Sequence, residues 1–163
     1  MAGQQKFVVD TSGVSLGSEV DVCRFALRLV AEDAKTFDAD IPLSRATDWP
    51  TSVRKAAERL SRHATGSRDE GEYYKKTGVV SASDHEDWEA FVCFAPYAFD
   101  ATVWGADRRL VDLADEGTSL VVHLSSVERE QLESFDDALS VVPLTRWRKR
   151  KPRRRQGSGP EAR

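Results

Sequence analysis

The sequence has 163 residues, of which 40% are hydrophobic, so it is long enough for one domain with a core of its own. No apolar run approaches the roughly 18 residues of a spanning helix, and the first residues lead straight into a predicted strand, so we expect neither a membrane segment nor a signal peptide. Of 24 basic and 27 acidic residues, nine basic and one acidic lie in residues 146–163, which gives this segment a net charge of +8 and residues 1–145 a net charge of −11.

The first two thirds of the chain alternate between strand and helix patterns. Ser18 and Asp21 resemble a capping box before a helical repeat, and Pro50 suits the first turn of a second helix. Ser83 and Glu86 form another capping-box pattern. The predicted elements are a strand at 6–10, a helix from 18 to about 35, an irregular acidic segment at 37–47, a helix from 50 to 64, a loop at 65–76, a brief strand at 79–80 and a helix from 83 to 95.

Residues 98–144 show a helix, strand, helix, strand rhythm. Leu110, Leu113 and Ala114 have helical spacing, so we expect a helix from Asp107 to Gly117. A short apolar run predicts a buried strand at 119–124, a serine cap predicts a helix from 126 to about 135, and a last strand follows at 140–144.

Two parallel strands need a crossover between them, and here a predicted helix supplies it. The expected fold is therefore α/β, with a single domain over residues 1–145 built on an open, mainly parallel sheet flanked by helices. Residues 146–163 have little to bury and strong self-repulsion, so we expect a disordered basic tail. Cys23 and Cys93 are expected to be free thiols of a cytoplasmic protein.

Three acids stand out by their positions. Asp10 ends the first predicted strand, Glu58 lies on the second predicted helix, and Asp100 opens the segment before the strand at 119–124. If the three carboxylates converge at one end of the sheet, they form a candidate catalytic set in which Asp10 and Asp100 bind Mg²⁺ or Mn²⁺. The other interpretation is that they are caps and solvated charges. His63, His85 and His123 show no metal-ligand spacing, and we expect them at the surface or satisfied in the core.

The order of segments resembles that of PIN-domain ribonucleases, a family that includes many bacterial toxin nucleases. The resemblance rests on FVVDTS with Asp10, on VRKAAERL with Glu58, on FDATVWGAD with Asp100, and on a VVHLSS strand end. It implies a metal-dependent ribonuclease in which these three acids hold the cation. The family's fourth acidic position is not matched, because Leu124 is followed by Ser125, Ser126 and Val127. A degenerate, inactive relative would show this pattern, and so would an unrelated Rossmann-like domain that shares only the topology.

The basic segment is the second candidate site. Its cationic residues can contact the phosphates of RNA or another polyanion, and an indole among them can stack on unpaired bases. Two interpretations of Trp147 are open: it stacks on bases, or it folds back and anchors the last strand. The candidate nucleic-acid-binding residues are Arg146, Trp147, Arg148, Lys149, Arg150, Lys151, Arg153, Arg154 and Arg155.

Two function classes follow from these observations. The first is the PIN-like ribonuclease or its inactive relative. The second is a non-enzymatic interaction module of a bacterial regulatory or conflict system, which docks a protein partner or a nucleic acid through its basic tail. The distance between Asp10 and Asp100 discriminates between them.

Overall fold

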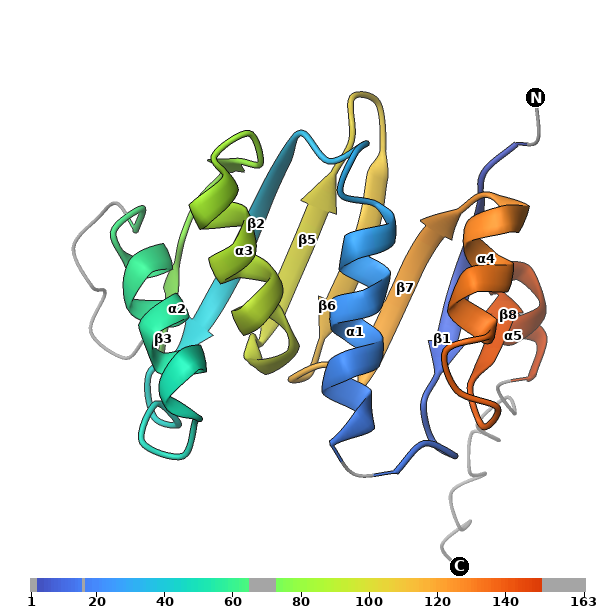
Figure 1. The fold of residues 1–163 in the computed structure, drawn as a ribbon, viewed down its shortest axis with the longest axis horizontal. Helices are drawn as coiled ribbons and strands as arrows, with labels where there is room; N and C mark the ends of the chain where they lie inside the picture. Colours follow the sequence, from blue (N-terminus) through green and yellow to red (C-terminus); the bar gives the residue numbers. More distant parts are fainter. Residues whose placement is uncertain (1–2, 16, 65–72, 151–163) are drawn as a thin grey trace, which may run out of the picture.

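The computed structural model of the protein describes residues 3–15, 17–64 and 73–150. These residues form one layer of strands with helices α1 to α4 over one of its faces (Figure 1). The helices are α1 Ser18–Leu29, α2 Thr51–Ser61, α3 His85–Phe94, the short 3₁₀ helix η1 Ala95–Tyr97, α4 Ser126–Glu133 and α5 Leu144–Arg150. The strands are β1 Gln5–Asp10, β2 Thr36–Pro42, β3 Tyr74–Lys76, β4 Val80–Ser81, β5 Asp100–Trp104, β6 Arg109–Ala114, β7 Ser119–Leu124 and β8 Ser140–Pro143.

The described sheet is antiparallel throughout, so the prediction of a mainly parallel sheet is wrong. Its strand order is β3-β2-β5-β6-β7-β1-β8, with β4 also paired to β2. Helix α4 does connect two strands that run in the same direction, β7 and β8. However, β1 lies between them and pairs antiparallel with both. The strands at 119–124 and 140–143 are therefore not the parallel neighbours that the sequence pattern predicted.

The largest local error in the predicted secondary structure lies in the meander formed by β5, β6 and β7. The predicted helix from Asp107 to Gly117 is strand β6 followed by a turn. The register shifts opposite Val103 and Trp104, and both Leu110 and Val111 are buried on the shifted strand. This irregularity breaks the alternation of a strand and leaves a spacing that imitates a helix.

Strand β2 replaces the irregular acidic segment expected at 37–47. Phe37, Ala39 and Ile41 are buried, and Asp38 and Asp40 alternate with them on the other face. Aspartate has a low strand propensity, which obscured the pattern, but burial of the alternate apolar residues decides the structure. Two other predictions differ less from the structure. The first helix ends at Leu29 and not near Lys35, and the predicted loop at 65–76 contains strand β3.

The core lies between the sheet and helices α1 to α4. Phe37 of β2 stacks on Phe91 of α3 with ring centroids 4.3 Å apart, and Trp49 meets Phe94 edge to face at 5.4 Å. Buried aromatic rings of this kind contribute strongly to core stability. Helix α3 therefore packs on β2 and on Trp49 through aromatic rings.

The opposite face of the sheet carries half-exposed and polar side chains. Val8, Thr102, Asp112 and Val121 form one row across neighbouring strands on this face, and none of them is buried. We call the face the open face, because helices α1 to α4 all lie on the other one (Figure 1). One polar and one apolar face is the usual pattern of an antiparallel sheet covered on one side.

The C-terminal segment begins as a helix. Residues 144–150 form α5, which packs beside β1 and β8, so the expected tail boundary at Arg146 falls inside a helix. Residues 151–163 lie outside the described residues. No helix in the described part of the chain is long and apolar enough to cross a membrane.

Candidate functional site

The structure places the three predicted acids on separate elements. Asp100 is the first residue of β5, not of a helix, and Asp10 is the last residue of β1. Both lie at the same end of the sheet, but β6 and β7 separate their strands. Three strand spacings put them roughly 14 Å apart. Glu58 is exposed on α2, which lies at the far end of the sheet from β1 (Figure 1).

These acids therefore do not share a metal site. Across the described residues, no group of three or more His, Cys, Asp or Glu side chains could hold a metal ion. Glu58 instead lines a groove of about 190 Å³ with Ile41 and Trp49. The expected Mg²⁺ or Mn²⁺ has no assembled ligand set among Asp10, Glu58 and Asp100.

Asp10 has a structural role at the end of β1. Its Oδ1 accepts a hydrogen bond from the backbone N–H of Ser12 at 3.0 Å, which closes a turn directly after the strand. Hydrogen bonds from the Ser12 side chain and backbone lower the pKa of the Asp10 carboxyl below its ordinary value of 3.8. The carboxylate is thus charged at neutral pH and held in a fixed orientation.

A hollow of about 420 Å³ opens beside Asp10. It lies where β1 ends, β7 begins and α1 starts, and α5 completes it through Trp147. The Trp147 indole thus lies against the folded domain, which corresponds to the second interpretation of this residue. We call this the β1-end hollow, and its lining consists of Val8, Val9, Asp10, Thr11, Ser12, Glu19, Thr118, Ser119, Leu120 and Trp147.

The β1-end hollow is lined by polar and apolar side chains together. Asp10 and Glu19 supply carboxylates, while Thr11 and Ser12 supply hydroxyls. Thr11 is only 7% exposed as a whole residue.

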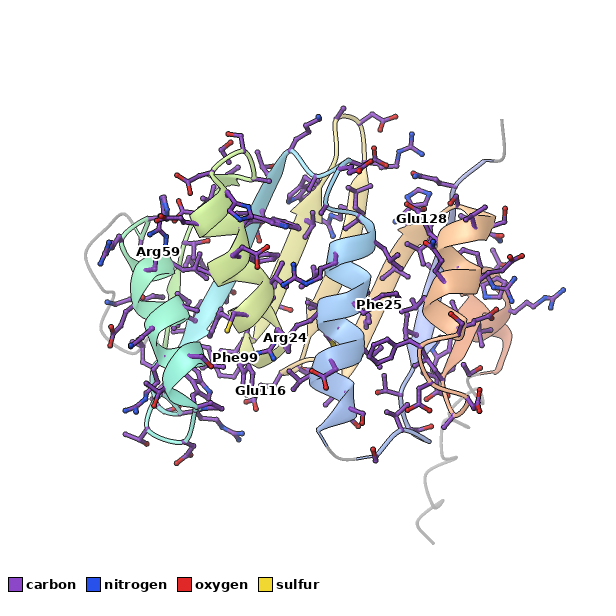
Figure 2. The ribbon with its side chains drawn as sticks, in the orientation of Figure 1. Arg24, Phe25, Arg59, Phe99, Glu116 and Glu128 are labelled. Carbon is purple, nitrogen blue, oxygen red and sulfur yellow. The ribbon has the colours of Figure 1, made fainter. Side chains whose placement is uncertain are left out.

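A second polar cluster joins α2 to α3 (Figure 2). Arg59 Nε lies 2.6 Å from Asp87 Oδ1, and His63 Nε2 lies 2.7 Å from Asp87 Oδ2. Asp84 and Glu86 also pair with Arg59, at 3.7 and 2.6 Å. The sequence signal was the four-residue spacing of Arg59 and His63, which places both on one side of the end of α2. The cluster connects two helices, and its groups are already paired with one another.

The basic segment is only partly described. Arg146 is exposed on α5, and α5 extends to Arg150. The predicted contacts of Lys151, Arg153, Arg154 and Arg155 fall outside the described residues. Their part in nucleic-acid binding stays a prediction.

Comparisons with protein-family models, with curated proteins and with solved structures gave no match. The resemblance to PIN-domain ribonucleases therefore stays a prediction.

Proposed function

We propose that this protein is a non-enzymatic interaction module that binds a basic polypeptide segment on its acidic folded part. The observation that carries the proposal is the open face, which α1 to α4 leave uncovered and which presents five aspartates from four strands. These aspartates are Asp10, Asp38, Asp40, Asp100 and Asp112.

The charge of the surroundings supports a cationic partner. Residues 1–145 carry a net charge of −11, so their field attracts a basic segment and repels a polyanion. Lys6, Lys76 and Arg109 lie on the same face, but Arg109 is already paired with Asp112 at 3.3 Å. The face retains more acids than cations.

The nuclease hypothesis lacks an assembled site. Hydrolysis of a phosphodiester by carboxylate-bound cations requires ligands that converge on the metal. The separation of Asp10 from Asp100 by two strands does not supply this convergence. An interaction module needs no such convergence, and therefore fits the geometry better.

RNA binding through the basic C-terminal segment is the competing outcome. That hypothesis rests on the net charge of +8 in residues 146–163. It predicts that the tail carries the affinity and that the acidic face weakens it. The basic-partner proposal predicts the reverse, so one experiment separates the two.

The test is fluorescence anisotropy of the full chain with a labelled nona-arginine peptide and with a labelled oligo-uridine RNA. The matched variant replaces Arg153, Arg154 and Arg155 with Gln and leaves the described domain unchanged. We expect saturable nona-arginine binding that this variant retains or strengthens, because it removes cations from the protein.

Two results would overturn the proposal. One is absence of nona-arginine binding at low salt. The other is tighter binding of the RNA than of the peptide, with loss of RNA binding in the Arg153, Arg154 and Arg155 variant. The second result would establish the tail as the functional site.

A further inference from the structure

We infer that the β1-end hollow is the receptor for one arginine side chain of the basic partner. This inference rests on the proposed function and gives it a location. The hollow combines carboxylates, hydroxyl groups and an indole ring. The carboxylates complement the charge of a guanidinium group, the hydroxyl oxygens complement its N–H donors, and the indole complements its flat surface.

The acceptors of the hollow complement the donors of arginine. A guanidinium has five N–H donors and no acceptor. The hollow offers the carboxylates of Asp10 and Glu19 together with the hydroxyls of Thr11, Ser12, Thr118 and Ser119. Thr118 donates its own proton to the carbonyl of Asp115 at 2.9 Å, so its oxygen is left as an acceptor. Two carboxylates also make the hollow a poor site for phosphate or another anion.

The Asp10 carboxylate is preorganised for this role. Its hydrogen bond from the Ser12 N–H fixes the carboxyl group at the end of β1. A group held in place by its own backbone loses little conformational entropy when it binds a ligand. Thr11 lines the same hollow, and its hydroxyl oxygen can accept a hydrogen bond from a donor that enters.

The Trp147 indole supplies a surface on which a guanidinium can stack. Arginine favours such stacking because its planar cation is weakly hydrated. Trp147 is half-buried and borders the hollow from α5, whereas Glu19 borders it from α1 and Asp10 from β1. The indole and the carboxylates therefore come from three separate elements.

On the open face, one guanidinium group of the protein itself already contacts both an indole ring and a carboxylate. The Arg109 guanidinium lies 4.6 Å from the centroid of the Trp104 ring and donates to Asp112 at 3.3 Å. Trp104 in turn donates from Nε1 to Asp38 at 3.0 Å. The β1-end hollow has the same combination of indole and carboxylates, but among the described residues no arginine or lysine lines it.

The volume of the hollow can accommodate an arginine side chain. About 420 Å³ lies at the lower end of the range for small-molecule sites. A metal ion needs several oxygen ligands within bonding distance, and no such group of acids exists in the described part of the chain. A guanidinium on a flexible stem can reach the acceptors that line the hollow.

The test titrates the full chain with ethylguanidinium and follows the backbone N–H signals by heteronuclear NMR, with Ser12 as the reporter next to Asp10. The variants Asp10→Asn and Glu19→Gln each remove one charge from the hollow. Glu58→Gln is the matched control, because it removes one charge from α2, away from the hollow and from the aspartates of the open face. Asn at position 10 still accepts the Ser12 hydrogen bond, so the turn is expected to persist.

We expect the Ser12 signal to move on titration, and Asp10→Asn or Glu19→Gln to weaken binding about fivefold. Glu58→Gln should leave the affinity unchanged. If all three variants weaken nona-arginine and ethylguanidinium equally, the hollow is not the receptor, although the proposed function stands. If the wild-type chain binds ethylguanidinium nowhere and nona-arginine not at all, both inferences fail.

Discussion

Asp87 shows how a buried charge is retained between two helices. Asp87 is 7% exposed, and burial by itself raises the pKa of its carboxyl group. Hydrogen bonds from Arg59 and His63 outweigh this effect and lower the pKa below the ordinary value of 3.8. The charged form is therefore the one that the fold stabilises.

The first prediction follows from this pKa shift. A carboxyl whose pKa is lowered by folding contributes stability above its unfolded pKa, and that contribution is lost as the pH falls through the lower, folded value. Asp87→Asn should lower the melting temperature by several degrees at pH 7, and the difference from wild type should shrink below about pH 4. Thermal unfolding followed by circular dichroism across this range measures it.

Asp107→Asn is the control for Asp87→Asn. Asp107 pairs with its neighbour Arg108 at 2.8 Å, but its side chain is 69% exposed. An exposed pair contributes little to stability. An equal loss in both variants would contradict the assignment of Asp87 as a buried, stabilising charge.

The second prediction concerns Gly117, in the turn between β6 and β7. Its φ is +80°, and a Cβ at this position would lie 2.9 Å from the carbonyl oxygen of Pro96. Gly117→Ala should therefore destabilise the protein by about 2 kcal/mol or more, from left-handed strain plus a backbone clash. Urea unfolding gives the value.

Gly78→Ala separates these two contributions. Gly78 has a φ of +67°, but nothing lies within 4 Å of its would-be Cβ. Gly78→Ala should therefore lower the free energy of unfolding only by the left-handed backbone strain, about 1 kcal/mol. Equal costs for the two variants would show that the contact between Gly117 and Pro96 is absent.

At the scale of elements, α4 is the helix whose start is most clearly encoded. Ser125 accepts a hydrogen bond from the Glu128 N–H at 3.3 Å, and the Glu128 carboxylate accepts one from the Ser125 N–H at 2.7 Å. This reciprocal pair is a capping box, and it satisfies two N–H groups that the helix leaves open.

The third prediction is that Ser125→Ala lowers the free energy of unfolding by about 1 kcal/mol. Ser126→Ala is the control, since Ser126 is exposed in the first turn and caps nothing in the structure. Chemical denaturation of both variants measures the two free energies of unfolding. A larger loss from Ser126→Ala would mean that the helix starts elsewhere.

The sequence predicted the elements whose local signals agree with their packing. The strand ending at Asp10, the helices around Val53 and Trp88, and the strand at 119–124 all form close to where expected. The failures lie where tertiary structure decides. The irregular pairing of β6 imitates a helix, and the insertion of β1 between β7 and β8 depends on contacts far apart in sequence.

The candidate site was predictable only in part. The position of Asp10 at a strand end was read correctly from KFVVD and the turn that follows. Its neighbours Glu19 and Trp147 lie nine and 137 residues away along the chain, and no periodicity or motif links them. Strand order brings them together, and the sequence pattern predicted a different order.

At the scale of the whole molecule, charge is divided between an acidic folded part and a basic C-terminal segment. The fourth prediction is that the affinity for nona-arginine falls about tenfold or more between low and high salt, because exposed charges are screened. Anisotropy titrations at several NaCl concentrations measure this dependence. An affinity that is independent of salt would point to apolar contacts instead of the acidic face.

The most direct test of the central claim follows the four indole N–H signals while the full chain is titrated with nona-arginine. Trp49 and Trp88 are buried in the core, Trp104 lies on the open face with Arg109 against its ring, and Trp147 borders the β1-end hollow. We predict that the Trp147 signal moves first and saturates, while the Trp49 and Trp88 signals stay in place. Binding that shifts Trp104 and leaves Trp147 unchanged would contradict the location, and a titration that moves no indole signal and shows no binding would contradict the function.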